Sequence, residues 1–122
     1  MKQKIETFAA YFDDSIARCA ELEKKLIADE RKDEAIFEKI RANVYNIFRT
    51  ILGVAVDTCG EDTEKIRDFF LYRIDQIPAS WSAAYETAKQ HNDAAKVQIE
   101  EIKLAVVQEI RAEFTKIWEE NS

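Results

Sequence analysis

The segment from Asp33 to Val56 carries an apolar stripe with the periodicity of an α-helix. Eight apolar side chains share one side of this helix: Ile36, Phe37, Ile40, Val44, Ile47, Phe48, Ile51 and Ala55. Four more widen the stripe: Tyr45, Leu52, Val54 and Val56. The apolar side then covers about half of the circumference, which is more than a surface helix with one packing partner shows. We therefore predict a central helix with neighbours on two sides.

Residues that interrupt helices are rare in this chain. Among its 122 residues, only Gly53, Gly60 and Pro78 are glycine or proline. Sheets and turn-rich folds need more of these residues, whereas alanine, glutamate, lysine, isoleucine and leucine favour helix. The predicted fold class is all-α, and the length predicts a single helical domain over residues 1–122.

Apolar periodicity and capping residues predict where the helices begin and end. The first helix is expected over residues 3–28. The central helix is expected to begin at an N-capping Asp33 and to end at Gly60, which can adopt a left-handed conformation. Asp62 or Thr63 is the expected cap of the third helix.

Pro78 is expected to break the third helix. Proline has no backbone N–H to donate, and it disfavours α geometry in the residue before it. Ser80 can cap the continuation, and Asn92 or Asp93 can cap the last helix. The sequence therefore predicts four helical segments, the third of them interrupted.

The expected architecture is an antiparallel four-helix-type bundle of two helical hairpins, residues 1–60 and residues 61–122, with the third helix broken at Pro78. The first turn leaves an alternative open, because residues 28–34 contain no glycine or proline. One continuous helix on the order of fifty residues long, in a dimeric coiled coil, also fits this segment.

The two predicted hairpins resemble each other weakly. Shifting the chain by 62 residues aligns residues 37–41 (FEKIR) with residues 99–103 (IEEIK), and Val44 with Val106. Seven of the sixty aligned pairs are identical, a number that shared helical composition comes close to producing. The alignment is consistent with an internal repeat, and the sequence leaves the question open.

The charge and hydropathy patterns argue against nucleic acid and membranes as partners. The formal net charge is −6, and no basic stripe offsets it, so phosphate backbones and anionic lipids are repelled. The longest strongly apolar run, residues 51–56, is far too short to span a bilayer. The first residues lack the uninterrupted apolar segment of a signal peptide, so a cytoplasmic location is expected.

Motifs for catalysis and metal binding are missing from the sequence. His91 is the single histidine, which excludes a di-metal bundle built on two Glu-x-x-His elements. No glycine-rich phosphate loop occurs. Cys19 and Cys59 stand forty residues apart, and their pattern leaves open whether they pair. We expect no enzymatic activity, no cofactor and no metal, with a hydrolase using carboxylates alone as the remaining catalytic alternative.

Four charged residues fall on or beside the apolar stripes: Glu23, Arg41, Arg73 and Glu113. If they face inward, they must find partners, because unpaired buried charges are costly, and they would then form a polar pocket or network. If they lie at the rim, the arginine stems cover apolar surface while the charged ends reach water. The spacing favours the rim.

A second group of residues exceeds what the predicted stripes can bury. Leu71 and Tyr72 point away from the line through Phe70, and Val97 and Leu104 lie off the stripe of the last helix. Excess apolar surface on a small, charged bundle predicts a protein interface. The predicted function is protein–protein interaction, with the same chain as a homodimer or with an unidentified partner. The alternative is a small-molecule-binding or sensing bundle whose pocket contains the four charges.

Overall fold

The computed structural model describes residues 2–119. Its helices are α1 (Lys2–Ala28), α2 (Lys32–Cys59), α3 (Thr63–Gln76), α4 (Pro78–Gln90) and α5 (Ala94–Glu119). No strand occurs within the described range, so the predicted all-α fold class is confirmed. None of these helices is long and apolar enough to cross a membrane.

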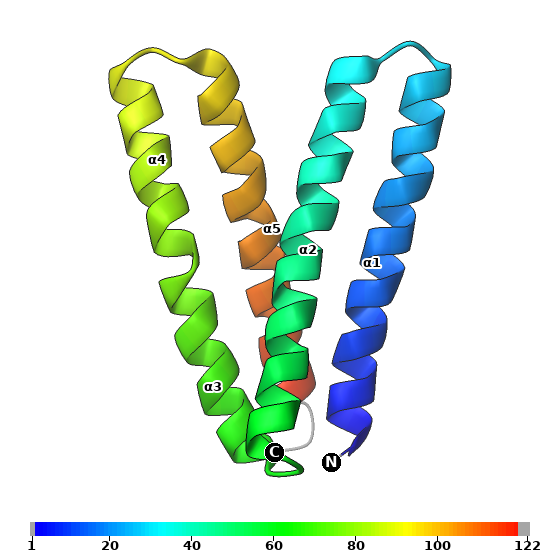
Figure 1. The fold of residues 1–122 in the computed structure, drawn as a ribbon, viewed down its shortest axis with the longest axis vertical. Coiled ribbons are helices and arrows are strands. Elements are labelled where there is room, and N and C mark those ends of the chain that lie inside the picture. Colours follow the sequence, from blue (N-terminus) through cyan, green and yellow to red (C-terminus); the bar gives the residue numbers. More distant parts are fainter. Residues whose placement is uncertain (1, 120–122) are drawn as a thin grey trace.

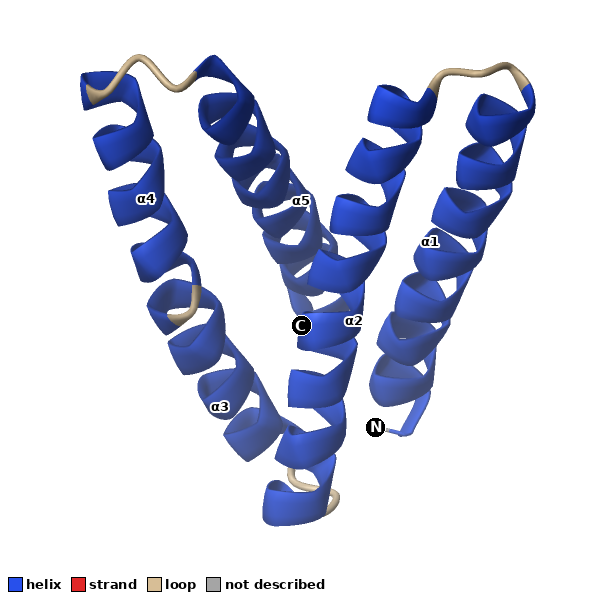
Figure 2. Cartoon of the chain, turned by 45° about the horizontal axis from the view of Figure 1, so that its top comes forward, coloured by secondary structure: helices blue, strands red, loops and turns tan. Residues whose placement is uncertain are grey.

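The helices form two antiparallel pairs that meet like the arms of a V (Figure 1). α1 packs against α2, α4 packs against α5, and α3 continues into α4 with a bend. The inner helices α2 and α5 contact each other. The arms converge at the end that holds the turn between α2 and α3, and they diverge toward the other two turns (Figure 2). α2 packs against α1, α3 and α5, as expected for the predicted central helix.

Aromatic rings form the centre of the core where the arms converge. The ring centroid of Phe70 in α3 lies 5.1 Å from that of Phe8 in α1 and 4.9 Å from that of Phe114 in α5. One ring thus joins three helices, in the edge-to-face and stacked arrangements that aromatic pairs prefer. The largest apolar side chains that are fully buried are Phe8, Phe12, Phe48, Phe70, Phe114, Ile66, Ile74, Ile110 and Val44.

The predicted apolar stripe of α2 is buried over only part of its length. Val44, Phe48 and Ala55 belong to the core, but Ile36 is 50% exposed and Ile47 is 36% exposed. The exposure of Ile36 follows from the divergence of the arms, which withdraws the second neighbour from the N-terminal half of α2 (Figure 1). Helical periodicity identifies the apolar side of a helix but does not reveal how far along that side a neighbour extends.

The turn between α1 and α2 shows that the alternative of one continuous helix is wrong. Glu30 has a positive φ of 61°, which no helical residue adopts. The predicted N-cap Asp33 is also wrong, because α2 begins at Lys32 and its N-cap is Arg31, which makes no capping hydrogen bond through its side chain. The predicted cap Asp62 is confirmed, since its carboxylate accepts from the backbone N–H groups of Glu64 and Lys65.

Pro78 breaks the third helix as predicted, but the continuation starts earlier than the predicted Ser80 cap. α4 begins at Pro78 itself. Proline at the first position of a helix loses nothing, because the N–H that it lacks has no partner inside the helix there. Ile77 keeps helical geometry, with φ −61° and ψ −44°, so α3 and α4 are joined by a bend and not by a loop.

The turns of the two hairpins are the same structure. The N–H of Arg31 donates to the carbonyl of Leu26 at 2.8 Å, and the N–H of Asp93 donates to the carbonyl of Ala88 at 2.9 Å. The residue before each donor has a positive φ, 61° at position 30 and 55° at Asn92. Each of these positions in the first turn has its counterpart in the second turn 62 residues later.

Contacts between helices repeat at the same spacing. Asp13 of α1 pairs with Arg49 of α2 at 2.9 Å, and Asp75 of α3 pairs with Arg111 of α5. Both residues of the second pair stand 62 positions after those of the first. The weak similarity that the sequence shows therefore corresponds to a repeat in the structure, in which α1–α2 matches α3–α5.

Candidate functional site

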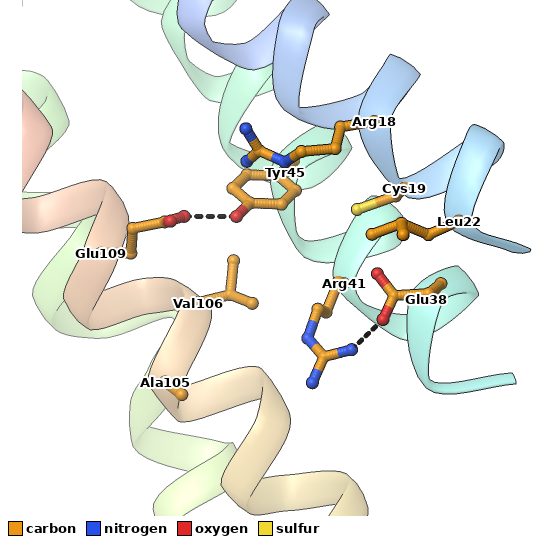
Figure 3. Close-up of a pocket in the computed structure, with 9 residues that line it drawn as sticks. All are labelled: Arg18, Cys19, Leu22, Glu38, Arg41, Tyr45, Ala105, Val106 and Glu109. Atoms are coloured by element: carbon orange, nitrogen blue, oxygen red, sulfur yellow. Dashed lines mark hydrogen bonds and ion pairs between the residues drawn. The ribbon is translucent and has the colours of Figure 1, made fainter. Parts of the chain in front are cut away.

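A pocket of about 470 Å³ lies between the first hairpin and α5 (Figure 3). It is lined by Arg18, Cys19 and Leu22 from α1, by Glu38, Arg41 and Tyr45 from α2, and by Ala105, Val106 and Glu109 from α5. Within each helix these residues are spaced by one, three or four positions, which places them on one side of the helix. The site thus depends on residues that are far apart in the sequence.

One wall of the pocket contains a buried carboxylate. Glu38 is only 9% exposed, and its carboxylate accepts a hydrogen bond from the guanidinium of Arg41, one turn further along α2. A buried carboxylate is costly without a charged partner; Arg41 is that partner, and the contact holds its guanidinium at the pocket. In Figure 3 the side chains of Arg18 and Arg41 both extend toward α5.

Two phenols share one carboxylate on the opposite wall. The hydroxyl of Tyr11 donates to the carboxylate of Glu109 at 2.8 Å, and the hydroxyl of Tyr45 donates to the same oxygen. Burial, followed by the hydrogen bond and the negative charge of Glu109, raises the pKa of both tyrosines well above the usual range. Both phenols therefore remain protonated and act as donors that link α1 and α2 to α5.

The Cys19 thiol is a poor nucleophile. Its side chain is 4% exposed, and burial, reinforced by the nearby Glu38 carboxylate, raises the pKa of the thiol. A thiol reacts through its thiolate, which this environment disfavours. No group of three or more histidine, cysteine, aspartate or glutamate side chains within the described range could hold a metal ion.

The four charged residues, for which a pocket or network was the alternative to the favoured rim positions, lie in separate places. Glu23 pairs with Lys39 at 3.7 Å, and Arg41 lines the pocket described above. The guanidinium of Arg73 lies 5.4 Å from the centre of the Phe69 ring. Within residues 2–119, no hydrogen bond or ion pair joins any two of Glu23, Arg41, Arg73 and Glu113.

The four residues predicted to form an interface lie on two helices. Leu71 of α3 packs against the core, whereas the adjacent Tyr72 is 63% exposed. Val97 and Leu104 are half-buried on the N-terminal half of α5. Tyr72 is thus the most exposed of the four.

The sequence reasoning missed the buried acids Glu38 and Glu100 and the acceptor Glu109. A signal for the first two was present, because the two glutamates are one of the seven identical pairs in the shifted alignment. Two polar residues that coincide inside apolar stripes indicate a shared structural role. Glu109 carried no such signal, since the tyrosines that use it lie on other helices.

A second cleft, of about 430 Å³, lies between α2 and α5 near the diverging end. Its lining residues are Asp33, Ile36, Phe37, Ala95, Gln98 and Ile99. The last three stand 62 positions after the first three, so this cleft is lined by matching positions of the two hairpins. Only Asp33 carries a charge among the six.

Comparison of the chain with protein-family models, curated proteins and solved structures finds no match.

Proposed function

We propose that the protein is a non-enzymatic helical module that acts in the cytoplasm by protein–protein interaction, with a second copy of the same chain as its partner. The observation that carries this proposal is the apolar cleft between α2 and α5, where Ile36 is 50% exposed and Phe37 is half-buried. A closed bundle would bury these side chains, and contiguous exposed apolar groups more often mark an interface.

The repeat supports a second copy as the occupant of the cleft. Residues 33, 36 and 37 of α2 and their counterparts 95, 98 and 99 of α5 both line the cleft, so the two hairpins contribute the same helix positions to it. Dimers with two-fold symmetry are the commonest oligomers, and their interface uses the same patch on both subunits. A second copy seated in the cleft would contact matching positions of α2 and α5.

The charges near the cleft also suit self-association. The chain has a formal net charge of −6, so contact between two copies is unfavourable over most of its surface. The lining of the cleft contains one charged residue, Asp33, and five uncharged ones. Like-charge repulsion between two copies is therefore small when their clefts face each other.

Light scattering across micromolar concentrations tests the proposal. The wild-type chain is expected to have the mass of a dimer, and Ile36→Asp together with Phe37→Asp is expected to reduce the mass to that of a monomer. Tyr72→Asp is the comparison, since it places one charge on an exposed ring that the sequence also suggested as interface but that lies outside the cleft, and it should leave the dimer intact. A monomeric wild type, or a dimer lost through Tyr72→Asp alone, would contradict the proposal.

A further inference from the structure

The repeat allows the pocket beside Cys19 to be compared with the matching place in the second hairpin. A shift of 62 residues relates Cys19 to Trp81, Glu38 to Glu100, and Arg41 to Lys103. Both glutamates are buried, and each pairs with the basic residue three positions later. The two hairpins therefore have the same polar wall, but they differ at the residue that faces it.

In the second hairpin an indole ring lies against this wall. The Nζ of Lys103 lies 5.4 Å from the centre of the Trp81 ring, within the range of a cation–π contact. The ring of Phe48 meets the indole edge-on, with centroids 6.5 Å apart and planes at 90°. Trp81 also packs against the hydrophobic core. Trp81 thus shows that an aromatic ring of the protein itself packs against this polar wall.

In the first hairpin the matching residue is cysteine, whose side chain is far smaller. Cys19 lines the open pocket of about 470 Å³, a volume typical of sites for small molecules. Arg41 stands at the position of Lys103, and arginine is the cation that most often lies over aromatic rings in proteins.

The charges of the pocket indicate a further feature of the ligand. Glu38 is paired with Arg41, and Glu109 accepts from two tyrosines. Arg18 lines the pocket and takes part in no hydrogen bond or ion pair within residues 2–119, so its charge is available to a ligand. An acidic group on the ligand would complement it.

We propose that this pocket binds a small planar aromatic molecule that carries an acidic group, with the ring against Arg41 and the acidic group on Arg18. The proposal goes beyond self-association and does not depend on it, because none of the nine pocket residues lines the cleft between residues 33–37 and 95–99.

Isothermal titration calorimetry with indole-3-acetate and with indole tests the ligand class. Wild-type protein is expected to bind one indole-3-acetate per chain, several-fold more tightly than the uncharged indole. Arg18→Ala is expected to remove this preference while both probes still bind. Failure of the wild type to bind either probe at millimolar concentration would overturn the proposal, and equal affinities for the two probes would overturn the role of Arg18.

Two variants, in which Cys19 and Trp81 are each replaced by the residue at the other position, test where the ligand binds. Cys19→Trp puts the protein's own indole into the pocket and is expected to abolish binding of indole-3-acetate. Trp81→Cys opens the matching place in the second hairpin, and is expected to raise the stoichiometry for indole from one to two. If Cys19→Trp binds the probe like the wild type, the pocket is not the site.

A measurement on the wild type keeps the test independent of whether these variants fold. Ring currents from a bound indole are expected to shift the methyl resonances of Ala105 and Val106, which line the pocket, when the probe is added. The methyl resonances of Ala94 and Val97, at the N-terminal end of α5 and outside this pocket, serve as the control. Shifts confined to the control methyls would overturn the assignment of the pocket.

Discussion

Glu38 and Glu100 stand 62 residues apart in the sequence and occupy the same place in their two hairpins. Both are buried, with exposed fractions of 9% and 4%. Each accepts from a basic residue three positions later, Arg41 in the first hairpin and Lys103, at 3.2 Å, in the second. Buried carboxylates cost free energy unless they are well paired, so their presence in both halves is the strongest mark of the repeat.

The two glutamates differ in how well their oxygens are paired. One carboxylate oxygen of Glu100 is buried without a hydrogen-bond partner. Glu100→Met is expected to increase the free energy of unfolding by about 1–2 kcal/mol, because an unsatisfied buried acceptor is removed while Lys103 can turn to water. Glu38→Met is the matched control, and it is expected to increase the free energy of unfolding by a smaller amount. Urea unfolding measures both; equal changes in the two variants would contradict this account.

The two turns offer a similar comparison. Glu30 and Asn92 occupy the same turn position, with φ of 61° and 55°. Asparagine tolerates this left-handed region better than glutamate, and glycine tolerates it best. Glu30→Gly is expected to raise the free energy of unfolding by up to about 1 kcal/mol, and Asn92→Gly by less. Thermal unfolding of both variants shows which one gains more stability. A larger gain for Asn92→Gly would show that strain at Glu30 is relieved by other contacts.

The shared carboxylate of Glu109 leads to a pH dependence. The pKa values of Tyr11 and Tyr45 are raised in the folded chain by burial and by Glu109, so each phenol loses its proton more readily when the chain is unfolded. Their contribution to stability is fully present below about pH 10 and is lost as the pH rises further. Replacing both tyrosines by phenylalanine should therefore flatten the decline in unfolding free energy above that pH. Denaturant unfolding at a series of alkaline pH values measures the slope, and an unchanged slope would contradict the prediction.

Arg73 and Glu113, two of the four charges singled out from the sequence, are expected to act independently. The guanidinium of Arg73 lies over Phe69 and bonds the Gln76 side chain at 3.3 Å. No ion pair or hydrogen bond within residues 2–119 joins it to Glu113. A double-mutant cycle with Arg73→Met and Glu113→Gln should be additive within about 0.5 kcal/mol. A coupling energy above about 1 kcal/mol would show that they are partners.

Several parts of the fold could be predicted because they depend on neighbours in the sequence. The apolar periodicity predicted the helices, and Asp62 predicted the start of α3, since a carboxylate caps the N–H groups of the next two or three residues. Pro78 predicted the break in the third helix for an equally local reason. The error at Ser80 arose because proline can itself begin a helix.

The all-α class, most helix ends and the weak similarity between the halves therefore follow from local sequence patterns. The tertiary structure alone decided that the arms diverge, which leaves Ile36 half exposed although it lies on the apolar stripe. It alone decided that Tyr11 and Tyr45 meet Glu109, and that Cys19 lines a pocket between the first hairpin and α5. The physical reason is that periodicity reports which side of a helix is apolar, whereas burial and pairing depend on which helix lies opposite and how closely it approaches.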